Sequence, residues 1–152
     1  MREVRVIRAI KLLQGLRVGP RFDMVEWGQG DLKENLAQLT EDDLHTGCGT
    51  SACALGWIAS TEAARAEGLR LVRPQPWIAY RVEYLPYKAN RPLEGAMAAW
   101  HYFGFEFEET VMRLFLPISY ELQRGYKAIT PAMVATRMQA VLDVGEAAFL
   151  KS

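Results

Sequence analysis

The chain has 152 residues, of which 50% are apolar and 24% are charged. This length suits one domain, and the composition excludes an intrinsically disordered chain. The 18 basic residues balance the 18 acidic ones, so the chain lacks the net charge with which proteins attract nucleic acids or anionic membranes nonspecifically. We therefore expect a single globular domain, residues 1–152, that folds without a partner.

Cysteine content and hydropathy indicate the compartment. Two cysteines, Cys48 and Cys53, are too few for a disulfide scaffold. The N-terminal segment has cations but no uninterrupted apolar run, which differs from a secretory signal. No stretch approaches the roughly 20 apolar residues of a membrane helix. We expect a cytoplasmic protein with reduced thiols and no membrane contact.

Residues 4–16 form the first predicted helix, because apolar residues recur there at helical spacing while Arg5, Arg8 and Lys11 gather on the other side. DNA binding by these cations is disfavoured by the zero net charge and by the lack of a groove-reading motif, so we do not expect a nucleic-acid partner. Residues 28–47 are polar and acidic, which predicts a mainly irregular loop.

Residues 50–67 form the second predicted helix, with Thr50 as its N-cap and Gly68 just after its end. Its first turns are apolar on almost every side, which places it at the centre of the fold. The alternating patterns of residues 69–72 and 77–85 predict strands of a small antiparallel sheet. Basic residues outnumber acidic ones in this middle region. They can form an ordinary solvated surface, or a basic face that binds an anionic ligand.

Three more helices are predicted at residues 93–103, 108–115 and 131–150. The last has the clearest signals, since Thr130 can cap it and Pro131 suits its first turn, with Glu146 on the polar face. The whole pattern predicts a mainly helical α+β fold, with about five helices around a central buried helix and a small antiparallel β-sheet.

The most unusual local sequence runs from His45 to Cys53 and combines two thiols, an imidazole, hydroxyl groups and two glycines. Packing alone can explain it, because the glycines permit a turn, Thr50 caps the next helix and the cysteines pack as small apolar side chains. Anion binding is the second interpretation, since a glycine-rich turn at a helix N-terminus presents backbone N–H groups. The candidate ligand-binding residues are Gly47, Cys48, Gly49, Thr50 and Ser51.

Cysteine chemistry is the third interpretation, because a thiol at a helix N-terminus ionises more easily. Cys48 would be the nucleophile and His101 or His45 the base. The Cys-Gly-x-x-Ala run with a distant histidine is loosely similar to papain-like peptidases, whose histidine usually lies on a strand. The fourth interpretation, zinc held by the two histidines with Cys48 and Cys53, has poor ligand spacing. We predict no metal and no cofactor.

Arg137 is unusual because it falls at the edge of the apolar face of the last predicted helix. It can extend its charged end to solvent or pair with an acid such as Glu106 or Glu108. A buried arginine also holds carboxylates and phosphates, so we include Arg137 among the candidate ligand-binding residues.

Several short motifs, taken together, carry a resemblance. They are Phe22-Asp23-Met24 with Trp27; Cys48-Gly49-Thr50 with Ala52-Cys53 and Gly56-Trp57; Tyr102-Phe103-Gly104; Leu114-Phe115 with Pro117; and Ile129-Thr130-Pro131 with Val134-Ala135 and Arg137. This pattern resembles small uncharacterised proteins of bacteria and their phages, which share a C-G-T-x-A-C-x-x-G core and a closing T-P-x-x-V-A-x-R helix. The resemblance implies no catalytic residue, only a bacterial, phage or prophage accessory protein.

The sequence leaves two classes of function open. The first is a non-enzymatic protein that binds a protein partner or a small phosphorylated ligand, a role compatible with a homodimer. The alternative is a small cysteine-dependent hydrolase that uses Cys48 with His101 or His45. The lack of a complete catalytic set favours the binding protein.

Overall fold

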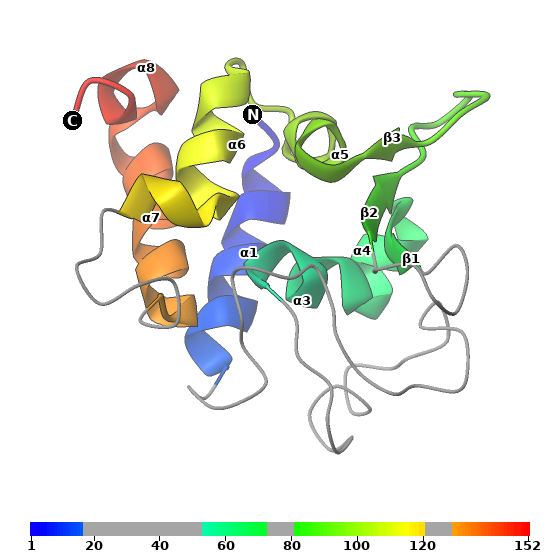
Figure 1. The fold of residues 1–152 in the computed structure, drawn as a ribbon, viewed down its shortest axis with the longest axis horizontal. Helices are drawn as coiled ribbons and strands as arrows, with labels where there is room; N and C mark the ends of the chain where they lie inside the picture. Colours follow the sequence, from blue (N-terminus) through cyan, green and yellow to red (C-terminus); the bar gives the residue numbers. More distant parts are fainter. Residues whose placement is uncertain (17–52, 73–80, 121–128) are drawn as a thin grey trace.

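The computed structural model describes residues 1–16, 53–72, 81–120 and 129–152 (Figure 1). These residues form seven α-helices, one short 3-10 helix and three strands, which confirms the mainly helical α+β fold. The five predicted helices become seven because two of them are interrupted. Within the described ranges, every helix is too short or too polar to span a lipid bilayer.

The first and last long helices lie side by side at one end of the molecule (Figure 1). These are α1 (Glu3–Gly15) and α7 (Pro131–Val144). Each turns one apolar stripe toward the other and toward the core. The fully buried side chains of the two stripes are Val6, Leu13, Val134, Met138 and Val141. The helical periodicity of both segments therefore correctly predicts which of their side chains are buried.

The predicted central helix is two helices, α3 (Ala54–Ser60) and α4 (Glu62–Ala66). Every residue of α3 is buried, which confirms its central position. The prediction of one helix capped by Thr50 is wrong: α3 begins after Cys53, whose Sγ accepts a hydrogen bond from the N–H of Gly56 at 3.4 Å. The chain is extended at Thr61, whose hydroxyl oxygen accepts from the N–H of Ala64 and caps α4.

The strands β1 (Leu69–Val72), β2 (Arg81–Tyr84) and β3 (Leu93–Glu94) form an antiparallel sheet in that order. Gly68 precedes β1 and has a φ of +91°. This positive φ is the conformation expected of a glycine just after the end of a helix. A Cβ atom there would lie 2.6 Å from the carbonyl oxygen of Leu85, so the position needs glycine.

Two further helices, α5 (Gly95–Phe103) and α6 (Glu108–Phe115), lead to the 3-10 helix η2 (Pro117–Tyr120). Residues 93–94, predicted as the start of a helix, are the strand β3 instead. The rings of Phe103 and Phe115 stack with centroids 5.8 Å apart, which joins α5 to α6 in the core.

The last predicted helix ends early, because α7 stops at Val144 and Gly145 separates it from α8 (Glu146–Phe149). Gly145 has a φ of +79°, a value that glycine adopts without strain. The expected cap is confirmed, since the Thr130 hydroxyl accepts from the N–H of Met133 at 3.3 Å. The placement of Glu146 on a polar face is wrong: its side chain is buried against the start of α6.

Candidate functional site

Most of the predicted site residues lie outside the described residues. This applies to the whole proposed turn, Gly47, Cys48, Gly49, Thr50 and Ser51, and also to His45. The structure describes the three remaining candidates, Arg137, His101 and Cys53. The anion-binding turn and the Cys48 nucleophile stay predictions.

His101 and Cys53 occupy different environments. His101 is exposed on the last turn of α5, and its ring centroid lies 5.0 Å from that of Trp100. Cys53 is buried and caps α3 through its sulfur atom. In the ranges that the structure describes, no three His, Cys, Asp or Glu side chains are grouped so that they could hold a metal ion. Within the described residues, neither His101 nor Cys53 therefore belongs to a group of three or more potential metal ligands.

Arg137 extends from α7 across the corner between α6 and η2. Its guanidinium donates to the backbone oxygen of Arg113 at 2.7 Å and to the backbone oxygen of Ser119 at 2.8 Å. It also donates to the Ser119 hydroxyl at 3.0 Å. Its planar face lies 3.7 Å from the ring centroid of Tyr120, a close cation–π contact.

Of the alternatives for Arg137, the ion pair with Glu106 or Glu108 is not formed. Backbone carbonyl groups of Arg113 near the end of α6 and of Ser119 in η2 accept from the guanidinium instead. Burial raises the pKa of the neighbouring Tyr120 hydroxyl, although the positive charge of Arg137 opposes this effect. That hydroxyl stays neutral and donates to the carbonyl oxygen of Leu114 at 2.7 Å.

Beside Arg137 lies an open cleft of about 690 Å³, which we call the basic cleft. Its walls come from α6, η2, α7, α8 and the residues that follow α8. The described residues that line it are Arg113, Ser119, Tyr120, Arg137, Ala140, Phe149, Lys151 and Ser152. It combines three cations with hydroxyl groups and a small apolar surface, a mixture that suits a small polar ligand.

The charge of the basic cleft is only partly neutralised. Arg113 pairs with Glu109 at 3.4 Å, and its guanidinium also donates to the backbone oxygen of Phe149 at 3.5 Å. In the described part of the chain, no carboxylate lies within ion-pair distance of Arg137 or Lys151. The cleft therefore presents a surplus of positive charge, which attracts an anion.

Sequence reasoning finds Arg137 in this cleft but misses Arg113 and Lys151. Both belong to polar positions of amphipathic segments, where a charged side chain usually faces solvent. Arg113 comes to the cleft on α6, and Lys151 comes to it because α7 ends at Val144 and the chain continues through α8. Gly145 within the last predicted helix was the signal in the sequence for this break, because a glycine destabilises the interior of a helix.

A second polar cluster joins α1 to α4 and α5, and it includes Arg5 and Arg8, two of the three cations considered for DNA binding. The carboxylate of Glu67 pairs with Arg5 at 3.0 Å and with Arg8 at 3.1 Å, and it accepts from the Tyr102 hydroxyl at 2.8 Å. Burial by itself raises the pKa of Glu67, but these hydrogen bonds and charges hold it below its ordinary value. Arg5 and Arg8 are thus held in ion pairs within the chain.

No protein family model matches this chain, and neither a curated protein nor a solved structure shows significant similarity to it.

Proposed function

We propose that this protein is a non-enzymatic binding protein whose ligand is a small phosphorylated molecule held in the basic cleft. One observation carries the proposal: three cations line one open cleft, and two of them, Arg137 and Lys151, have no carboxylate partner in the described ranges. The volume of about 690 Å³ lies within the roughly 300–1,000 Å³ typical of small-molecule sites. The suggested bacterial or phage origin remains a prediction.

The two kinds of cation have different tasks in this proposal. Arg137 is fixed by hydrogen bonds to Arg113 and Ser119, so its charge is held in place before a ligand arrives. Lys151 is exposed after α8 and can reorient to meet a phosphate oxygen. The Ser119 hydroxyl already contacts Arg137, and the nearby Ser152 adds a second hydroxyl to the lining.

Titration of the protein with inorganic phosphate and pyrophosphate, followed by isothermal calorimetry and by backbone amide shifts in NMR, tests the proposal. We expect saturable binding of pyrophosphate, with shifts centred on η2 and on residues 149–152. Lys151→Glu should weaken it by about tenfold or more, because attraction becomes repulsion beside the anion. Lys11→Glu is the matched control, since Lys11 is exposed on α1 outside the cleft lining.

Two results would contradict this function. Equal weakening by Lys151→Glu and Lys11→Glu would show that the anion responds to overall charge rather than to the basic cleft. A lack of saturable binding of either anion to the unmodified protein would reject a phosphate site in this cleft.

A further inference from the structure

The loop of residues 85–92 between β2 and β3 projects from the body of the molecule, at the end opposite α7 and α8 (Figure 1). We call this loop the hairpin tip. Its base is fixed, because the N–H of Leu85 donates to the carbonyl oxygen of Gly68 at 3.0 Å and Tyr84 pairs with Leu93. Within it, the N–H of Ala89 donates to the oxygen of Pro86 at 2.9 Å and closes a turn.

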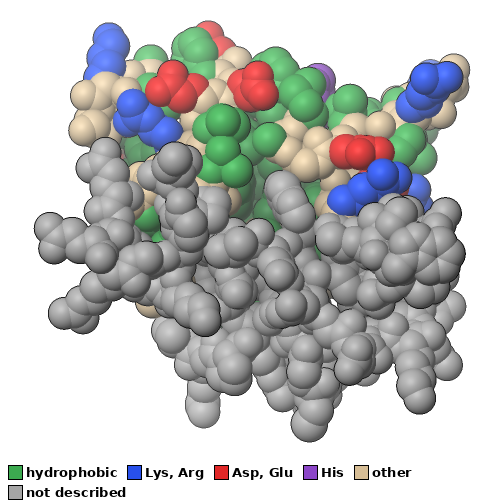
Figure 2. Space-filling view, in the orientation of Figure 1, with side chains coloured by type: hydrophobic (Ala, Val, Ile, Leu, Met, Phe, Trp, Pro, Cys, Tyr) green, Lys and Arg blue, Asp and Glu red, His purple; other side chains and the backbone are tan. Residues whose placement is uncertain are grey.

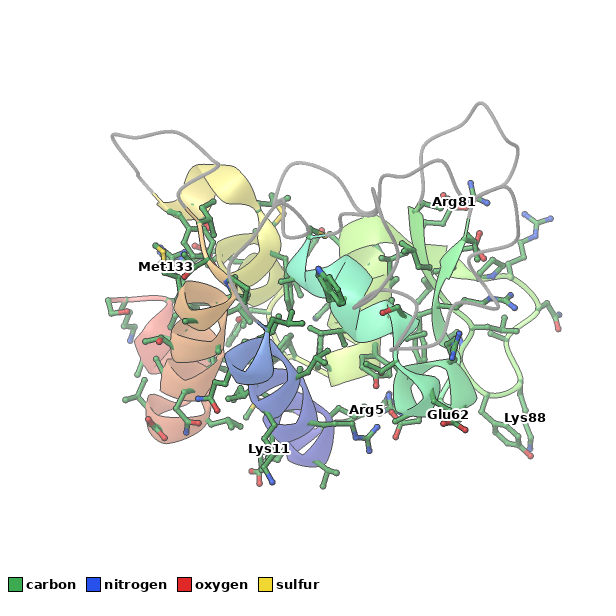
Figure 3. All side chains as sticks on the ribbon, turned by 90° about the horizontal axis from the view of Figure 1, so that it is seen from below. Arg5, Lys11, Glu62, Arg81, Lys88 and Met133 are labelled. Atoms are coloured by element: carbon green, nitrogen blue, oxygen red, sulfur yellow. The ribbon has the colours of Figure 1, made fainter. Side chains whose placement is uncertain are left out.

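The turn holds an aromatic and a cationic side chain away from the core. Tyr87 is 90% exposed, and the ammonium of Lys88 lies 5.3 Å from its ring centroid. Lys88 has a φ of +67°, a left-handed conformation that costs a residue with a Cβ about 1–2 kcal/mol. Figure 3 shows Lys88 at the outer end of the loop, pointing away from the helices. Strained backbone positions cluster at functional sites, so this turn is a candidate for a binding element.

The charges of this region fall into two groups. The strand cations are neutralised, since Arg81 pairs with Glu83 at 2.8 Å and with Glu94 at 3.2 Å. Lys88 and Arg91 at the hairpin tip are exposed and have no ion pair with any residue that the structure describes. Figure 2 shows Lys and Arg side chains at this outer end. Among the described residues of this region, the strand charges are thus balanced and the unpaired positive charge lies at the tip.

We propose that the hairpin tip is a docking element for an acidic surface on a partner protein, independent of the basic cleft. Tyr87 provides an exposed aromatic anchor, and Lys88 and Arg91 pair with carboxylates of the partner. Tyrosine and arginine are enriched among the residues that dominate binding energy in protein interfaces. The rigid base reduces the entropy that the tip loses on binding.

The small size of the tip decides among anionic partners. Binding to an anionic membrane usually needs clusters of about 4–8 basic residues. Stable binding to a nucleic acid often involves about 6–10 phosphate contacts. The two cations and one aromatic side chain of the tip are too few for either kind of binding. They match the central contacts of a small, salt-sensitive protein interface.

Selection of displayed random peptides of about twelve residues on the complete protein tests this proposal. We expect enrichment of peptides rich in Asp and Glu, with affinity that falls as salt is raised. For the best peptide, fluorescence anisotropy should show at least about tenfold weaker binding to Tyr87→Ser/Lys88→Gly. Glycine at position 88 removes the charge and keeps the left-handed backbone, so this variant should fold normally by circular dichroism.

The matched control is Val144→Ser/Lys11→Ser, which also removes one exposed apolar and one exposed cationic side chain, far from the tip. It should change the affinity less than about twofold. The proposal is overturned if no acidic peptide is enriched, or if the selected peptides bind the tip variant as well as the control. It is also overturned if tip-dependent binding is seen only with phosphatidylserine vesicles, or only with an oligothymidylate.

Discussion

The buried carboxylate of Glu146 links α8 to the beginning of α6, and its removal tests how this part of the fold is stabilised. The side chain is 8% exposed and accepts hydrogen bonds from the N–H groups of Glu106 at 3.0 Å and Phe107 at 3.2 Å. It also accepts from the Thr110 hydroxyl at 3.0 Å. No side chain of α6 or its N-cap residue caps that helix, so Glu146 replaces a local cap.

Glu146→Ala leaves three donors without their acceptor. A hydrogen bond to a charged group contributes about 1.5–3 kcal/mol, and an unsatisfied buried donor costs about 1–3 kcal/mol. Water can reach part of the opened site, and the cost of burying the carboxylate disappears. We therefore expect a loss of about 3–5 kcal/mol, a large share of the roughly 5–15 kcal/mol that stabilises a typical domain. Glu146→Gln keeps one acceptor oxygen and should lose about half as much.

Equilibrium urea unfolding followed by far-ultraviolet circular dichroism measures these losses. Glu109→Ala is the control, because Glu109 lies on α6, the helix that Glu146 caps; its side chain is 62% exposed and its ion pair within the described residues is with Arg113. It should change the free energy of unfolding by no more than about 0.5 kcal/mol. If Glu146→Ala lost less than about 1 kcal/mol, or no more than this control, the capping role assigned to the carboxylate would be wrong.

Three further predictions follow from single contacts. Gly68→Ala should cost at least about 2 kcal/mol in urea unfolding, because of the positive φ and the close carbonyl oxygen of Leu85; an unchanged midpoint would contradict this. Arg137→Met should lower the free energy of unfolding by about 2–4 kcal/mol. Arg137→Lys should not restore the lost stability, because only a guanidinium reaches all the acceptors of Arg137. Thermal melts in which Arg137→Lys is as stable as the unchanged protein would count against this prediction. Glu67 has a lowered pKa in the folded state, so its carboxylate contributes stability at pH values above its pKa in the unfolded chain. This contribution is lost as the pH falls through the pKa of the folded state. Glu67→Gln should therefore flatten the acid limb of stability against pH relative to the unchanged protein, and identical acid limbs would disprove the linkage.

The sequence predicts the helices and strands of this fold well where periodicity and end signals agree. Residues 108–115 and the beginning of α7 at Pro131 are placed correctly, with Thr130 as cap. Gly68 is also correct, because its left-handed conformation is local and specific to glycine. These features depend on a few neighbouring residues, which a single sequence contains.

The breaks inside helices were missed for a physical reason. Thr61 lies between two stretches that are both helical in pattern, and its hydroxyl caps the second only because the chain bends there. Gly145 likewise sits within continuous helical periodicity. In both cases tertiary packing decides between a straight helix and a broken one, since propensity differences are about 1 kcal/mol or less per residue.

The candidate site was hard to predict because it depends on contacts between residues that are far apart in the sequence. Arg137 and Glu146 are both polar side chains that bind backbone groups at the two ends of α6: Arg137 binds the carbonyl oxygen of Arg113 near its C-terminus, and Glu146 binds N–H groups just before its N-terminus. Together they fix the position of α6 against α7 and α8, the elements that line the basic cleft. The cleft's shape therefore depends on these two internal side chains, whereas the anion binding that we propose depends on Lys151, for which the structure gives no hydrogen bond or ion pair with α6. It follows that Arg137 and Glu146 variants should change stability and binding together, but Lys151 variants should change binding alone.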